Sequence, residues 1–286
     1  MFLVFGLSKV IDQIGQMKDL DSISKPLSDV VSKVTAPDAV KNALSGTWLG
    51  HQLHPMLTDL PIGAWSMASA LDLTSRGTMP KASERLVGLG ILTAVPAALS
   101  GASDWSESYG KEQRLGLVHA LGNSVGTTLQ VASWISRRCG HHRTGTGLSL
   151  AGLAATMGAS YLGGHLSFGM GVGVDHTAFQ KTITKWVDVA AENEVTEGQL
   201  LRVEANDVPV MLTRHKGQLR ALSATCLHAG GPLNKGHIEN DCVVCPWHGS
   251  RFRLTDGTPK RGPAAMRQPT WDINIVDGRV QVRSAA

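Results

Sequence analysis

Four side chains that can bind a metal stand as two short pairs in the last quarter of the chain. Cys226-Leu227-His228 is followed, after 16 residues, by Cys245-Pro246-Trp247-His248. The two pairs supply two thiolates and two imidazoles from two loops. Thiolates are soft ligands and imidazoles are borderline ones, and this combination suits an iron–sulfur cluster or a zinc ion. The spacing therefore predicts a metal centre.

Zinc is the competing interpretation, because Cys242-Val243-Val244-Cys245 is also a C-x-x-C pair. With Cys226 and His248 it makes a four-coordinate set of the kind that structural zinc sites use. Residues 238–244 have the composition of a strand, however, which puts Cys242 inside a sheet, where free cysteine is a common small core residue. Two histidines replacing two cysteines on one iron of a [2Fe–2S] cluster is the other known use of such a set, and we favour it.

Over residues 187–286 the sequence resembles the Rieske [2Fe–2S] family. The resemblance implies an all-β domain in which Cys226 and Cys245 hold the buried iron, while His228 and His248 hold the outer iron. It also implies that a proline loop covers the cluster. The residues that carry the resemblance are Cys226-x-His228, Gly230-Gly231-Pro232-Leu233, Gly236, Cys245-Pro246-Trp247-His248-Gly249, Phe252, Gly257 and, for the proline loop, Gly262-Pro263-Ala264.

The resemblance also indicates a branch of the family. Respiratory Rieske proteins carry a disulfide between the cluster loops. The matching positions here are Gly230 or a neighbour and Trp247, so this disulfide is absent. Ser250 corresponds to a family serine that donates to a bridging sulfide, whereas Phe252 replaces a tyrosine. Fewer donors to the sulfurs leave the reduction potential lower. These features favour the ferredoxin-like branch, which passes single electrons.

Oxygenase activity within this chain is not expected. Rieske oxygenases hold a second, mononuclear iron by two histidines and a carboxylate, in a large domain after the cluster. Only 38 residues follow His248, and none of them is a histidine.

Short alternating apolar runs follow Val187, and turn signals separate them: Asn206-Asp207, Lys216-Gly217, Asp256-Gly257 and Asp277-Gly278. This texture predicts an all-β module at 187–286, joined to the preceding part by a linker at 175–186. No internal repeat is evident in the sequence.

The middle of the chain is apolar and poor in charge, in segments at 55–73, 86–103, 115–136 and 145–166. Each is long enough to cross about 30 Å of hydrocarbon as a helix. A bundle in water would carry Lys and Glu on its outer faces at helical spacing, and these segments do not. We therefore predict a four-helix transmembrane bundle at 51–174, ahead of the Rieske-type β domain.

Residues 1–50 form an amphipathic helical region, in which Ile23, Leu27, Val30 and Val34 recur at helical spacing. It either lies on the membrane surface or caps the bundle, and we favour the cap.

The predicted bundle is similar to an uncharacterised four-span bacterial membrane family. The similar stretches are Trp48-Leu49-Gly50-His51-Gln52-Leu53-His54-Pro55, Asp59-Leu60-Pro61-Ile62-Gly63-Ala64-Trp65, Gly101-Ala102-Ser103-Asp104-Trp105, Val118-His119-Ala120-Leu121 and Gly163-Gly164-His165-Leu166. Four antiparallel spans bring all five stretches to one side of the membrane. Ionisable groups at membrane depth are costly and usually mark function.

Three uses of these polar groups stay open. His119 and His165 form the best pair for a b-type haem by their depth. The second interpretation is another kind of site, either a metal site formed by His51, His54 and Asp59 or a quinone pocket. In the third interpretation the histidines lie at the interface and hold no cofactor.

Charge and cysteine content bear on location and partners. The chain has 286 residues with a formal charge of +4, which gives no basic field for nucleic acid. Six basic residues near the spans lie on one side of the membrane and five on the side of the β domain, which leans toward an external β domain. The missing disulfide fits a reducing compartment, and we favour a β domain that faces the cytoplasm of a bacterial cell membrane.

The expected function is that of a membrane-anchored one-electron carrier with a Rieske cluster. Its partners are redox donor and acceptor proteins or a quinone, together with membrane lipid, and a haem is a possible relay. The alternative is a non-catalytic iron–sulfur sensor or regulatory module.

Overall fold

The computed structural model of the chain describes residues 2–75 and 78–285, and it divides into a helical unit and a β unit. The helical unit comprises residues 2–35 and 53–172. The β unit comprises residues 36–52 and 173–285. Residues 36–50, which the sequence analysis grouped with the N-terminal region, and residues 51–52, which it assigned to the bundle, therefore pack with the β domain.

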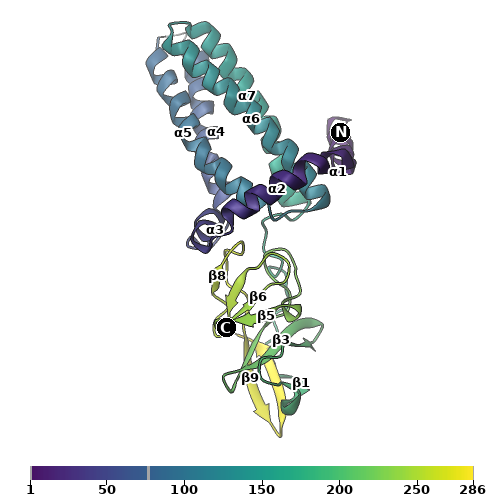
Figure 1. Cartoon of the computed structure of the whole chain (residues 1–286). Helices are drawn as coiled ribbons and strands as arrows, with labels where there is room; N and C mark the ends of the chain where they lie inside the picture. Colours follow the sequence, from purple (N-terminus) through teal and green to yellow (C-terminus); the bar gives the residue numbers. More distant parts are fainter. Residues whose placement is uncertain (1, 76–77, 286) are drawn as a thin grey trace. The chain divides into compact units, whose positions relative to one another are not determined.

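The helical unit contains α1 (Phe2–Gln16), η1 (Lys18–Leu20), α2 (Asp21–Thr35), α4 (Leu53–Thr74), α5 (Pro80–Trp105), α6 (Gly110–Arg138), α7 (His142–Gly164) and a π-helical turn η2 (His165–Gly169). All four apolar segments are helices, as predicted. The helices α4 and α5 form one antiparallel hairpin, and α6 and α7 form a second (Figure 1). Within the described residues one helix, α5, is both long and apolar enough to cross a membrane.

The helical unit buries polar side chains and exposes apolar ones. Leu92 on α5 is 70% exposed, whereas Arg137 on α6 is 1% exposed and pairs with Asp72 on α4. The other buried polar residues of these helices include Ser100, Ser103, Gln130, Ser133, Ser149 and Thr156, and the exposed apolar ones include Met67, Val95, Leu99, Leu121, Val125 and Met157. This distribution is the reverse of that in a protein core in water.

The helix α2 follows the same inverted pattern. Its Ser24 donates to Gln113 of α6, and its Ser28 donates to the carbonyl of Ser106. The apolar residues of the predicted amphipathic stripe, Ile23, Leu27, Val30 and Val34, are all exposed. The helix therefore packs on the bundle through its polar face and leaves its apolar face outward.

The two hairpins repeat the same contacts, which corrects the expectation that the chain holds no internal repeat. His54 and His119, Trp65 and Gln130, and Asp72 and Arg137 are each separated by 65 residues. Trp65 donates to the carbonyl of Val87 and lies against Gly90, while Gln130 donates to the carbonyl of Ser149 and lies against Gly152. The repeat is hard to see in the sequence because Trp65 and Asp72 correspond to Gln130 and Arg137, and because the spacing changes from 65 residues in the first helices to 62 in the second.

The β unit contains α3 (Asp38–Ser45), β1 (Val187–Ala191), η3 (Glu192–Glu194), β2 (Leu201–Ala205), β3 (Val208–His215), β4 (Gln218–Ser223), η4 (Leu233–Lys235), β5 (His237–Glu239), β6 (Cys242–Val244), β7 (Arg251–Arg253), β8 (Pro259–Arg261), β9 (Trp271–Val276) and β10 (Arg279–Ser284). Its antiparallel sheets have the strand orders β1-β10-β9, β2-β3-β4 and β5-β6-β7-β8.

Two-residue turns close the hairpins of the β unit. Asn206-Asp207, Lys216-Gly217 and Asp277-Gly278 all have positive φ at both residues, as the primed turns of hairpins require. These three turns were predicted. Asn240-Asp241 forms a fourth and splits the strand expected at 238–244 into β5 and β6.

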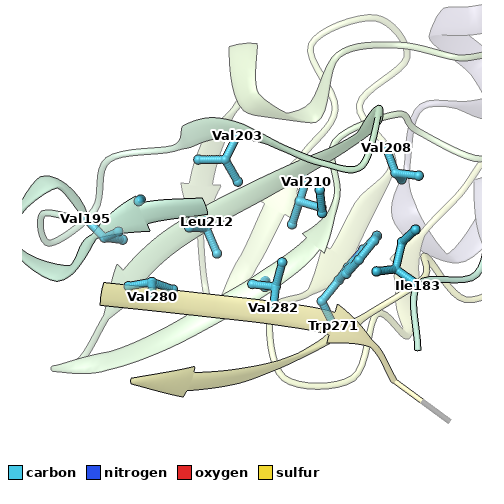
Figure 2. Packing of buried hydrophobic residues seen from close by; sticks show 12 residues of the cluster. Ile183, Val195, Val203, Val208, Val210, Leu212, Trp271, Val280 and Val282 are labelled. Atoms are coloured by element: carbon cyan, nitrogen blue, oxygen red, sulfur yellow. The ribbon is translucent and has the colours of Figure 1, made fainter. Parts of the chain in front are cut away.

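The main core of the β unit lies between the two three-stranded sheets (Figure 2). Val203, Val210 and Leu212 of one sheet face Val280, Val282 and Trp271 of the other. A second apolar cluster, with Met211, Leu222, Leu227, Leu233 and Phe252, surrounds the buried cysteines Cys226 and Cys245. This second apolar cluster therefore supports the two loops that carry the predicted ligands.

Candidate metal centre

The two loops that carry the predicted ligands have the same backbone design. One follows β4 and the other joins β6 to β7. The N–H of Cys226 donates to the carbonyl five residues later at 2.8 Å, and that of Cys245 does the same at 2.9 Å. The carbonyl of each cysteine accepts the N–H of a glycine four residues later, Gly230 or Gly249, at 2.8 and 3.0 Å. Both glycines have positive φ, of 77° and 68°, which a side chain would disfavour.

The two cysteine sulfurs meet inside the domain. The Cys226 thiol donates to the Cys245 sulfur, and both sulfurs accept backbone N–H groups from their own loops. The hydrogen bond from Cys226 lowers the pKa of Cys245 to about 7, although burial opposes this change. The hydrogen bond to Cys245, with burial, raises the pKa of Cys226. A thiolate is therefore accessible near neutral pH, and thiolate is the form that binds metals.

The two imidazoles also converge. The Nδ1 atoms of His228 and His248 are 3.2 Å apart, with the ring planes at 84°. Both residues are half-buried. Burial lowers the pKa of His228 to about 3, and the nearby His248, His176 and Lys41 add to this effect. A neutral imidazole is the form that ligates a metal.

The donor set fits a cluster with one sulfur-ligated and one nitrogen-ligated iron, because two sulfurs meet each other and two nitrogens meet each other. Gly231 leaves room for this arrangement, since a Cβ there would lie 3.0 Å from the Cys245 sulfur. The cysteines are deeply buried and the histidines are not.

The remaining residues singled out in this region lie as follows. Ser250 is fully buried, and its hydroxyl oxygen accepts the N–H of Ala264, which ties the proline loop to the second cluster loop. Phe252 is buried in β7. Cys242 is buried in β6, opposite Glu239 and Arg253, as expected of a core residue.

The short helix α3 packs against the proline loop. Asn42 accepts the N–H of Gly262 at 2.9 Å and donates to the carbonyl of Lys260 at 3.1 Å. Asp38 pairs with both Arg251 and Arg261. The sequence analysis missed this contact, although Pro37 before the helix and Gly46 after it, with φ of 79°, mark it as a separate element.

Lys41 on α3 is a buried cation close to the centre. Its side chain is only 1% exposed, and its charge lies near enough to His228 to contribute to that residue's lowered pKa. Lysine is rarely buried to this extent. Nothing in the sequence around Lys41 predicts that it lies near His228, because the two residues are 187 positions apart.

The histidines of the helical unit are arranged differently from the predicted pairs. The ring of His119 lies beside that of His54, with centroids 6.4 Å apart. His165 lies in the turn η2 with its ring against Gly169. His51 is exposed in the β unit, and Asp59 is exposed on α4. The sequence singled out His54 and His119 separately, and only the fold brings them together.

Comparisons with known proteins agree with the two-part organisation. Residues 185–272 match the model of the Rieske [2Fe-2S] domain, and residues 50–176 match that of a predicted membrane protein family (DUF2231). The anthranilate 1,2-dioxygenase ferredoxin subunit of Burkholderia cepacia is 31% identical over 103 residues, which are 36% of this chain and 95% of that protein.

A second relative and one solved structure are also similar to this chain. Ferredoxin CarAc of Metapseudomonas resinovorans is 28% identical over 98 residues, 34% of this chain and 92% of that protein. The solved complex of reduced oxygenase and oxidized ferredoxin in carbazole 1,9a-dioxygenase contains a chain that is 27% identical, with 34% of this chain and 92% of that chain covered and a TM-score of 0.33.

Proposed function

The chain belongs to the Rieske [2Fe–2S] family through its residues 185–272, and from this membership we propose that it is a membrane-anchored one-electron carrier. A Rieske domain implies a [2Fe–2S] cluster. In our proposal Cys226 and Cys245 ligate the inner iron, and His228 and His248 ligate the outer iron. The observation that carries the proposal is the pairing of like ligands, sulfur with sulfur and nitrogen with nitrogen, on two loops of the same design.

The placement of the histidines supports electron transfer at their edge. They are half-buried, whereas the cysteines lie in an apolar cluster. The neighbouring Trp247 is 55% exposed. A cluster held by these four residues would take up and release single electrons, and the half-buried histidines would give donor and acceptor proteins access to it. Neutral imidazoles make the site less negative than four thiolates would, which raises its potential.

We propose four membrane spans, α4 to α7, which anchor this carrier. The chain matches a predicted membrane protein family there, and α5 is long and apolar enough to span a bilayer. The inverted burial of the helical unit supports the other three spans, because apolar side chains face outward on all of them. The proposed division begins with an N-terminal region at 1–50, and the outward apolar face of α2 supports lipid contact for its residues 21–35, whereas residues 36–50 belong to the β unit.

The proposed division continues with a membrane domain at 51–174, a linker at 175–186 and the cluster domain at 187–286. We place the protein in a bacterial cell membrane with the cluster domain in the cytoplasm. Its redox partners are then a donor protein and an acceptor that is an oxidoreductase component, a quinone or a haem of the membrane domain. Ferredoxins of dioxygenase systems among its relatives support a protein acceptor.

The experiment is an anaerobic purification of the full chain in detergent. We expect two irons and two acid-labile sulfides per chain, and an EPR signal that appears on reduction and vanishes on oxidation. Cys226→Ser and His248→Ala remove the signal, whereas Cys242→Ser, the matched control, keeps it. Colourless protein with bound zinc and no sulfide would refute the proposal. A cluster that cannot be reduced and reoxidised, but whose loss changes partner binding, would favour the sensor.

Orientation is tested with a single accessible cysteine. In a Cys139→Ser background, since Cys139 is exposed, the variant Lys181→Cys adds a thiol near the start of the cluster domain. A membrane-impermeant thiol reagent labels it in broken cells and not in intact cells if the domain is cytoplasmic. Equal labelling in both would place the domain outside.

A further inference from the structure

The histidines His54 and His119 occupy equivalent places in the two helical hairpins. His54 starts the first helix of one hairpin, and its Nδ1 lies 2.8 Å from the carbonyl oxygen of Ala97 on the second helix. His119 lies on the first helix of the other hairpin, and its Nδ1 lies 2.7 Å from the carbonyl oxygen of Ala159. The four positions correspond under the same repeat that relates the rest of the hairpins.

These contacts fix the protonation of both rings. A carbonyl oxygen only accepts, so Nδ1 carries the hydrogen in each imidazole, and Nε2 carries the lone pair. Asn123 donates to the Nε2 of His119 at 3.3 Å, in agreement with this tautomer. A histidine that ligates a metal through one nitrogen typically donates its other N–H to a carbonyl or carboxylate. Both rings thus have the tautomer and the support of metal ligands.

A glycine cradles each ring. A Cβ at Gly101 would lie 2.5 Å from the ring of His54, and a Cβ at Gly163 would lie 2.8 Å from the ring of His119. Real side-chain contacts are not that close, so any other residue at either position displaces the imidazole. Each glycine lies four residues, or about one helical turn, after the alanine whose carbonyl accepts the hydrogen bond from the ring. The two rings are therefore positioned by matched backbone features on two separate hairpins.

The separation of the rings agrees with ligation of one metal from opposite sides. A metal–imidazole bond is about 2.0–2.1 Å, and a ring atom is about 1.2 Å from the ring centre, so two imidazoles on opposite sides of one metal have centroids about 6.4 Å apart. The observed centroid distance is 6.4 Å. A tetrahedral pair of ligands would bring the centroids closer. Two opposed imidazoles leave four positions of a six-coordinate iron for other ligands, which is the number of nitrogens that a porphyrin supplies.

We infer that His54 and His119 are the two axial ligands of a b-type haem held by α4 and α6. The porphyrin would supply the other four nitrogens, and each histidine would supply its Nε2, which in His119 would replace the hydrogen bond from Asn123. This inference deepens the proposed function and rests on it only for the role of the haem as a relay, since haem binding itself does not require the cluster. It replaces the pair His119 and His165 with a pair that the fold brings together.

The probe is hemin added to the detergent-purified full chain. We expect one hemin per chain, with a sharp Soret band and the low-spin EPR spectrum of two axial imidazoles. His54→Ala and His119→Ala should each lower hemin affinity at least tenfold and lose the low-spin signal. His165→Ala is the matched control and should bind as the wild type does. The reduced-state EPR signal of the cluster, unchanged in all variants, shows that the β unit is folded and separates this test from that of the proposed function, while an unchanged helical signal shows that the helical unit is folded.

A second variant covers the case in which alanine disrupts the bundle. His54→Met replaces one axial nitrogen with a thioether, which still ligates haem iron and raises its potential. We expect this variant to keep hemin and to move its midpoint potential upward, which a merely structural histidine would not do. Wild-type protein that takes up no hemin, or alanine variants that bind hemin as the wild type does, would overturn the inference, as would loss of binding in His165→Ala.

Discussion

The helical unit and the β unit distribute the same kinds of side chain in opposite ways. In the β unit Val210, Leu212 and Leu222 are fully buried, and of its described charged residues only Lys41 is buried. In the helical unit Gln130 and Arg137 are buried, while leucines and methionines face outward. Burial of apolar surface stabilises a fold by removing that surface from water. The reversal is what the proposed membrane anchor predicts, with water around the β unit and lipid around the helices.

The difference also explains what holds each unit together. The β unit has two apolar clusters, and its cluster loops stand on one of them. The helical unit relies on close backbone approach at glycines and on hydrogen bonds between helices, for example Gln130 to Ser149 and Ser133 to Gly145. Such contacts are typical of helix pairs in membranes, where hydrophobic burial gives no drive for association.

A matched pair of leucine substitutions gives the largest contrast. Leu212→Ala leaves a cavity in the core of the β unit and should cost about 2–5 kcal/mol of unfolding free energy. Leu92→Ala on the outward face of α5 should cost about 0.5 kcal/mol or less. Denaturant unfolding of the full chain in detergent measures both costs. The absorbance of the cluster follows unfolding of Leu212→Ala, and the helical signal follows unfolding of Leu92→Ala. Equal costs would contradict the proposed difference between the β unit and the helical unit.

The buried ion pair of the helical unit gives the next effect. Arg137→Gln leaves Asp72 buried without its cation and should cost about 3 kcal/mol, toward the lower end expected for breaking a buried pair. The double variant Asp72→Asn with Arg137→Gln removes both charges and should recover part of that loss. Arg138→Gln, on the exposed side of the same helix, is the control and should be nearly neutral. Thermal unfolding in detergent measures all three, and a neutral Arg137→Gln would contradict the expectation.

A lysine on the outward face tests the solvent directly. Leu92→Lys places a charge on the proposed lipid face and should cost about 2.5–3.5 kcal/mol of insertion free energy near the bilayer centre. The readout is the fraction of chain that resists carbonate extraction from membranes. Ile275→Lys, on an exposed position of β9, should change nothing measurable. If Leu92→Lys instead makes the chain more soluble with full stability, the helices face water.

The smallest effect concerns the buried lysine beside the metal centre. A cation near the cluster stabilises the reduced state, which carries one more negative charge. Lys41→Met should therefore lower the midpoint potential, by an amount on the order of tens of millivolts. Lys216→Met, an exposed lysine of the β3–β4 turn, is the control. Redox titration followed by EPR measures the shift, and an unchanged potential would show that the charge of Lys41 is screened.

The ligand pairs and most of the fold follow from local sequence. Cys226-x-His228 and Cys245-x-x-His248 are contiguous, and the glycines beside them need positive φ whatever surrounds them. The four apolar segments are helices because their composition and length leave few alternatives. Three of the four hairpin turns follow from residue pairs such as Asn206-Asp207, which favour positive φ.

Contacts between distant segments were decided by the tertiary structure alone. Helical periodicity predicted that α2 is amphipathic, but a stripe at 3.6-residue spacing looks the same whether it faces a core or a lipid. The packing of α3 on Gly262 depends on a contact between residues that are 220 positions apart. The approach of His54 and His119 depends on the docking of two hairpins, which the sequence does not encode in any local pattern.

The sequence by itself thus determines the proposed metal-binding chemistry, because ligand type and loop spacing are local properties that do not depend on packing. Only the tertiary structure places Lys41 near His228 and His54 beside His119. The physical reason is that electrostatic and coordination contacts depend on distance in space, and distance in space between remote segments is set by the packing of whole elements.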